Sequence, residues 1–157
     1  FTKGKPLAEA LGLPTPIIPN TVVTAGQVYW AWLGPGRWLL SGDEGSVHDA
    51  AERARRVLPD SSGLVVLISD ARCALQLAGP SARSAIASHC PLDLHPRAFA
   101  PGRCAQSLLG ETGVFVHQVD TSPTFIITVD RTAASYAWEL LSGSIVAEAS
   151  QSALEDG

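Results

Sequence analysis

Two strand-like runs joined by a tight turn and followed by a segment of helical period recur three times between residues 28 and 141. Strands joined by short turns pair antiparallel, and helices that follow such hairpins pack on the sheet. The pattern therefore predicts an α+β fold built from repeated ββα units, with a mainly antiparallel sheet and helices on one face. The expected strand, strand and helix of the three units lie at 28–33, 38–40 and 46–58, at 64–68, 73–77 and 80–89, and at 114–118, 124–129 and 132–141.

Local signals mark the ends of these elements. Ser46 with Asp49 resembles a capping box for the first helix. Pro80 suits the first turn of the second helix, where its missing N–H costs nothing. Asp130 is expected to cap the third helix.

The length of 157 residues fits one domain with flanking segments. Four prolines fall in residues 1–27, so we expect an extended arm there, with one short helix near 7–11. Residues 28–145 are expected to form a single domain. The tail from Ser142 lacks a clear period, and residues 146–157 are predicted to be flexible.

Charge and hydropathy exclude two classes of function. The net charge is 11 − 15 = −4, which argues against a surface that neutralises nucleic-acid phosphates. The longest apolar runs fall far short of the roughly 20 residues that cross a bilayer as a helix. Three cysteines with no C-x-x-C pair support neither a disulfide framework nor a zinc knuckle, so we expect a reducing, cytoplasmic location.

The densest group of reactive side chains is His89, Cys90, Asp93, His95 and Arg97. A thiolate beside an imidazole is a possible nucleophile pair. We favour a structural interpretation, because cysteine is among the most buried residue types and a histidine at a helix C-terminus is favourable there.

Other catalytic or ligand signals are weak. Cys90, His95 and Cys104 are ligands that zinc accepts, but their spacing matches no established zinc pattern. His48 and His117 stand alone and are interpreted as structural or surface residues. No nucleophile elbow, P-loop, dinucleotide-binding glycine motif or H-E-x-x-H occurs.

Aromatic residues gather around the first predicted hairpin. Tyr29, Trp30, Trp32 and Trp38 fall within ten residues, and alternation along a strand puts Trp30 and Trp32 on one face. They are equally consistent with a core cluster and with a partner surface, because interfaces are enriched in tryptophan and tyrosine.

Five sequence runs resemble the gamma subunit family of heterotetrameric sarcosine oxidase, and CPLDLHP is the most specific piece among them. These runs are WLGPGRWLL at 32–40, DARCALQLAGPSAR at 70–83, CPLDLHPRAF at 90–99, CAQSLL at 104–109 and the segment from FII at 125–127 to YAW at 136–138.

The resemblance implies a non-catalytic subunit of a flavoenzyme that oxidatively demethylates sarcosine to glycine and passes the one-carbon unit to tetrahydrofolate. It implies FAD, FMN and NAD on the partner subunits and none on this chain, with the alpha and other subunits of the complex as partners. It also implies a fold similar to part of the folate-binding domain of the glycine-cleavage aminomethyltransferase. The candidate partner interface comprises Trp30, Trp32, His95 and Arg97.

Two alternatives accompany this hypothesis. The implied fold leaves open a stand-alone folate- or pterin-binding protein. A small thiol enzyme that uses Cys90 with His89 or His95 ranks last. The N-methyl amine that such a complex oxidises is not specified by this chain.

Overall fold

The computed structural model describes residues 4–26, 28–58 and 63–155, and the chain divides into two units at Ile68 and Ser69. The first unit contains α1 (Gly4–Leu11), β1 (Val22–Ala25), β2 (Val28–Gly34), β3 (Arg37–Gly42) and α2 (Glu44–Val57). The second contains the 3₁₀ turn η1 (Ser69–Ala71), β4 (Arg72–Ala78), α3 (Ala82–Ala87), β5 (Cys104–Leu109), β6 (Thr112–Asp120), β7 (Thr124–Asp130), the 3₁₀ turn η2 (Arg131–Ala133) and α4 (Ala134–Glu155).

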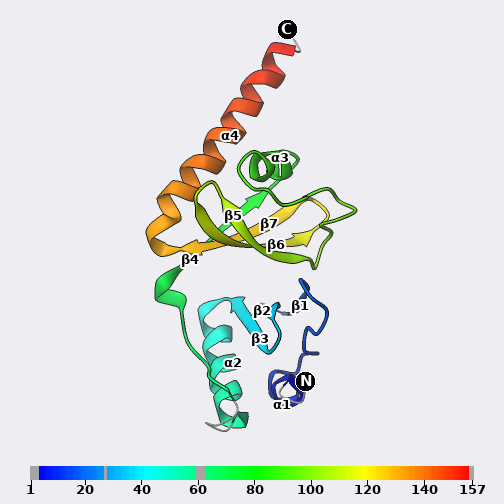
Figure 1. Cartoon of the computed structure of the whole chain (residues 1–157), viewed down its shortest axis with the longest axis vertical. Helices are drawn as coiled ribbons and strands as arrows, with labels where there is room; N and C mark the ends of the chain where they lie inside the picture. Colours follow the sequence, from blue (N-terminus) through cyan, green and yellow to red (C-terminus); the bar gives the residue numbers. More distant parts are fainter. Residues whose placement is uncertain (1–3, 27, 59–62, 156–157) are drawn as a thin grey trace. The chain divides into compact units, whose positions relative to one another are not determined.

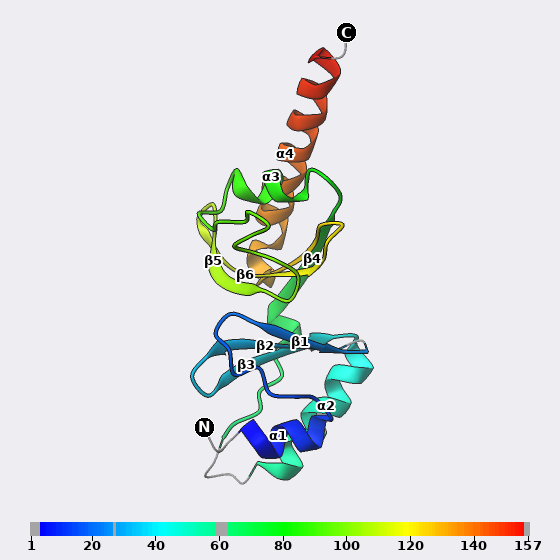
Figure 2. The same ribbon diagram turned by 90° about the vertical axis from the view of Figure 1, so that its right-hand side faces the viewer.

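In the first unit, an antiparallel sheet in the order β1-β2-β3 carries α1 and α2 on one face (Figure 2). The helices bury their apolar sides against Trp30 of β2, whose side chain is 0% exposed. Trp38 of β3 packs edge-on against Trp30 at 6.1 Å between ring centroids, and its Nε1 donates to the Pro16 carbonyl at 3.0 Å. The proline-containing segment before β1 is thereby tied to the core of this unit.

The second unit is an antiparallel sheet in the order β4-β7-β6-β5, with α3 and α4 on the same face (Figure 1). Its core alternates along the central strand β7, where Phe125, Ile127 and Val129 are fully buried. Ile86 of α3 and Ala137 of α4 close over them. The C-terminal half of α4 extends past α3 in both views (Figures 1 and 2).

The ββα pattern is confirmed for the first and third repeats and is wrong for the second. The predicted strand at 64–68 pairs with no strand in the described part of the chain. β4 instead pairs with β7, with Leu75 opposite Ile127. The described strands form one sheet in each of the two units, where a single domain over 28–145 was expected.

Three helix boundaries also differ from the sequence predictions. α2 begins at Glu44 because the Asp43 carboxylate accepts the Ser46 amide at 3.0 Å, which makes Asp43 the N-cap in place of Ser46. Pro80 precedes α3 instead of lying in its first turn. Asp130 lies at the N-cap position of η2, which leads into α4, but its side chain makes no cap hydrogen bond and pairs with Arg72 at 2.5 Å.

The expected arm and tail contain regular structure. The short helix near 7–11 is confirmed as α1, and α4 continues to Glu155 through the segment predicted to be irregular. Ser142 and Ser144 fit inside this helix because their hydroxyls donate to the carbonyls of Trp138 and Leu140, at 2.7 and 3.1 Å. The ends of the predicted arm and tail, residues 1–3, 27 and 156–157, lie outside the described residues.

Candidate functional site

The thiol and the imidazoles near residue 90 have separate partners. Cys90 is buried in the core of the second unit, and its Sγ lies 3.6 Å from the hydroxyl of Ser107 on β5. His89 places Nε2 2.8 Å from the hydroxyl of Ser144 on α4. This geometry favours a structural role for both side chains over a nucleophile pair.

The three candidate metal ligands are not gathered into one site. Cys90 packs on the helical face of the sheet, whereas Cys104 points to the opposite face from Ser107 along β5. His95 is exposed in the connector. Among the residues that the structure describes, no three histidine, cysteine or acidic side chains cluster as metal ligands do.

The connector between α3 and β5 is irregular in backbone but internally hydrogen-bonded. The Asp93 carboxylate accepts the His95 amide at 3.0 Å, and Nδ1 of His95 accepts the Arg97 amide at 3.2 Å. The His95 carbonyl accepts the amides of Ala98 and Phe99 at 2.8 Å. These bonds define the loop while the side chains of Asp93, His95 and Arg97 remain exposed.

Arg83 of α3 fastens this connector to the core. Its guanidinium donates to the carbonyls of Leu94 and Phe99 and, at 2.9 Å, to Oε1 of Gln118 on β6. It also lies 5.2 Å from the centre of the Phe125 ring, within the range of a cation–π contact. These contacts anchor the loop that carries His95 and Arg97 to the core of the second unit.

The candidate interface residues fall into two groups. Trp30 belongs to the core of the first unit and is 0% exposed, which favours the core alternative over a partner surface for this residue. Trp32 is half-buried, and His95 and Arg97 are exposed, so an interface role for these three stays a prediction. The aromatic density that suggested a surface reflects in part the packing of Trp30 with Trp38.

His117 is buried on β6, opposite Cys104 of β5 and Ile126 of β7. Burial disfavours the charged imidazolium and lowers the pKa of His117 to about 4. The imidazole is therefore neutral near pH 7, which fits the structural role expected for it.

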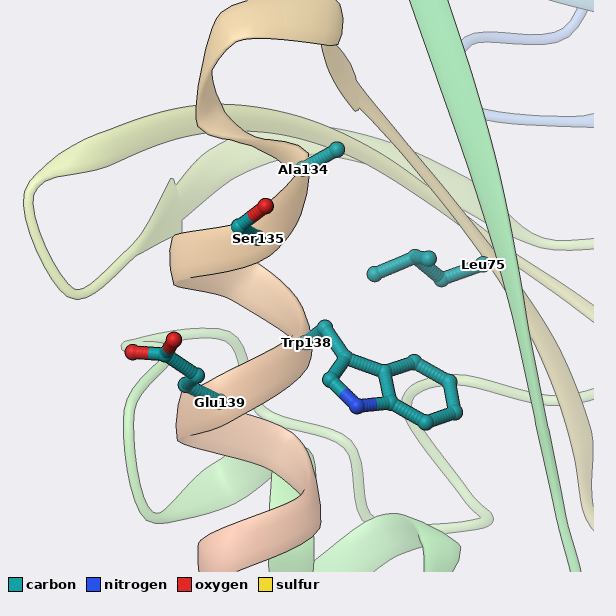
Figure 3. A pocket seen from close by; sticks show the side chains of 5 residues that line it. All are labelled: Leu75, Ala134, Ser135, Trp138 and Glu139. Carbon is teal, nitrogen blue, oxygen red and sulfur yellow. The ribbon is translucent and has the colours of Figure 1, made fainter.

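Two exposed apolar features were missed at the sequence level. Residues 64–68 were predicted to form a strand of the sheet, yet Leu64 is 86% exposed. Trp138 on α4 is 61% exposed and flanks a shallow groove of about 390 Å³, which is lined by Leu75, Ala134, Ser135, Trp138 and Glu139. Figure 3 shows the indole of Trp138 and the side chain of Leu75 in the space between α4 and β4. No helix of the described chain is both long and apolar enough to cross a membrane.

These features describe a protein of mixed helices and antiparallel sheets, with an internally hydrogen-bonded connector and exposed apolar side chains. Residues 4–148 match the family model described as the sarcosine oxidase, gamma subunit family. The chain belongs to this family.

Relatives and a solved structure agree with this assignment. The chain is 33% identical to the sarcosine oxidase subunit gamma of Corynebacterium sp. strain P-1 over 77% of its length, and 32% identical to that of an Arthrobacter species over 77%. It spans 59% of the length of each of these relatives. It is also similar to a chain of the heterotetrameric sarcosine oxidase from Corynebacterium sp. U-96 in complex with pyrrole 2-carboxylate, with a TM-score of 0.84, 26% identity and coverage of 93% of this chain and 74% of that one.

Proposed function

We propose that this chain is the non-catalytic gamma subunit of a heterotetrameric, sarcosine-oxidase-like flavoenzyme and that it packs on the large alpha subunit. The complex would oxidatively demethylate sarcosine to glycine and pass the one-carbon unit to tetrahydrofolate. The observation that carries the proposal is the family match over residues 4–148.

The geometry supports a binding role for this chain. Cys90 and His89 are each engaged by a serine, and the connector presents His95 and Arg97 from a loop already anchored by Arg83. A preorganised loop loses little conformational freedom when it docks. In this proposal FAD, FMN and NAD are bound by the partner subunits, and this chain completes the assembly.

A reducing cytoplasm is the compartment that we propose for the complex. Cys73, Cys90 and Cys104 are all thiols in the structure, with no disulfide among them. Disulfides are rare in that compartment.

The test is co-expression of the other subunits of the host's own complex with and without this chain. We expect a flavin-containing complex that includes the chain and produces hydrogen peroxide from sarcosine, and a lower yield of intact complex without the chain. Partner subunits that assemble and turn over equally well in its absence, and never co-purify with it, would refute the proposal.

The likeness of the fold to the folate-binding domain of the glycine-cleavage aminomethyltransferase is a further part of the proposal. It leads to the alternative of direct folate or pterin binding by this chain alone. Calorimetric titration of the purified chain with tetrahydrofolate separates the two functions. We expect no binding heat, and saturable binding would favour the alternative.

A further inference from the structure

The outer strand β4 of the four-stranded sheet carries few of the sequence features that usually protect an edge strand. β4 is a terminal strand of this sheet, seven residues long, and contains neither proline nor lysine. Its one charged side chain, Arg72, pairs with Asp130 at 2.5 Å. Natural edge strands are commonly protected by charges, prolines, bulges or short length. Along the rest of β4, the backbone N–H and C=O groups of the outer edge have no charged β4 side chain beside them.

The core is also incomplete along this edge. Cys73, Leu75 and Leu77 lie opposite three β7 residues that are 0% exposed, yet all three remain partly exposed themselves. On the helical face of the sheet, the apolar side chains of β7 are therefore fully buried, whereas those of β4 are only partly buried. One more strand beside β4 would extend the apolar cover, since strands in a sheet lie about 4.8 Å apart.

Trp138 lines the groove that side chains of such a strand would fill. Its side chain lies on the β4 side of α4, next to Leu75, and Ala134 lines the same groove (Figure 3). A 61% exposed tryptophan beside an apolar floor is the type of residue that anchors protein interfaces.

We propose that the open edge of β4 and the groove beside Trp138 bind an extended, uncharged strand of another subunit of the complex. Backbone hydrogen bonds to β4 would supply the register, and apolar side chains at alternate positions would fill the groove against Leu75 and Trp138. This inference rests on the proposed gamma-subunit function and names one surface through which it is carried out.

The direct test is amide hydrogen exchange over residues 72–78 in the chain alone and in the complex with its co-expressed partner subunits. We expect the amides on the open side of β4 to exchange at least about tenfold more slowly in the complex, because they gain hydrogen-bond partners. A complex that forms without this protection would overturn the strand proposal and leave the subunit function standing. If no complex forms, both proposals fail.

The chain alone also distinguishes other occupants. Slow exchange of the open-side amides of β4 without partners, with a molecular mass of two chains by light scattering, would show that a second copy covers the edge. Slow exchange in a monomer would show that the chain itself covers it. Either result would overturn the proposal.

Paired variants test the anchor. Leu108 on β5 is also half exposed and lies on the opposite edge strand, so Leu108→Ala is the matched control for Trp138→Ala. We expect Trp138→Ala to weaken assembly at least about tenfold and Leu108→Ala to change it less than about twofold, with both chains folded by circular dichroism. Equal effects, or no effect of Trp138→Ala, would contradict the proposal.

Discussion

Arg83 is expected to be the main stabiliser of the connector, and Arg83→Leu tests this directly. The substitution removes the donors to the Leu94 and Phe99 carbonyls and to Gln118, together with the contact to the Phe125 ring. Hydrogen bonds to a charged group contribute about 1.5–3 kcal/mol each when well buried. Because Arg83 is only half-buried, hydrogen bonds to water offset part of this contribution. We therefore expect Arg83→Leu to lower the free energy of unfolding by about 2–4 kcal/mol in total.

The assays are urea unfolding and thermal unfolding of the chain, together with hydrogen exchange of the connector. For a unit that spans residues 69–157, a loss of this size lowers the melting temperature by at least about 8 °C. Connector amides should exchange faster in Arg83→Leu before global unfolding begins. Arg97→Leu is the matched control, because its side chain is exposed, and it should stay within about 0.5 kcal/mol of the parent protein. An unfolding free energy for Arg83→Leu inside that same margin would refute this account of the loop.

Three further predictions concern the core of the first unit, the buried His117 and one helix cap. Trp30→Ala should lower the free energy of unfolding by about 3–5 kcal/mol in denaturant titrations, because Trp30 is buried. Trp138→Ala, at an exposed position, should lower it by less than about 1 kcal/mol. Similar losses for the two variants would contradict the assignment of Trp30 to the core. Because the pKa of His117 is lowered from 6.5 to about 4, its contribution to stability is complete above pH 6.5 and is lost as the pH falls toward 4. His117→Phe should reduce the slope of the unfolding free energy against pH across that range. An unchanged slope would contradict a neutral, buried imidazole at His117. Hydrogen bonds from Ser46 lower the pKa of Asp43, so the stability that this cap contributes is present above the usual carboxyl pKa of 3.8 and lost as the pH falls below it. Asp43→Ala should therefore reduce helical circular dichroism at pH 7 but not at pH 2, and an equal reduction at both would argue against the cap.

The sequence predicted the elements whose signals are local. The hairpin of β2 and β3 follows from two apolar runs around Gly34-Pro35-Gly36, and the hairpin of β6 and β7 from the turn at 120–123. That turn is stabilised as its residue types suggest, with the Asp120 carboxylate accepting the amides of Ser122 and Thr124 at 2.9 and 3.0 Å. These features depend only on neighbouring residues.

Two of the wrong predictions concern features that depend on distant partners. Residues 64–68 are as apolar as a buried strand, but a strand exists only when another pairs with it, and the partner of β4 lies some fifty residues later. Hydrophobic periodicity predicted that the last helix ends at 141, but α4 continues to Glu155. Its later part contacts α3, because the Ser84 hydroxyl donates to the Glu148 carboxylate at 2.8 Å.

The sequence predicted which residues the connector contains but not the contacts that hold it in place. The connector was recognised as irregular, and His95 and Arg97 were chosen from it, but no sequence signal identified Arg83 as the residue that holds it. Trp30 was ambiguous because burial and interface use the same aromatic residues, and only its 0% exposure decides for the core.

Affinity purification of the tagged chain from its native host tests the central claim most directly. The bound proteins are identified by mass spectrometry, and the eluate is scanned for flavin absorbance. The account predicts recovery of the alpha subunit and the other subunits of a sarcosine-oxidase-like complex in stoichiometric amounts, with a flavin spectrum. A chain recovered alone and colourless would contradict the subunit function, whatever its fold shares with the family.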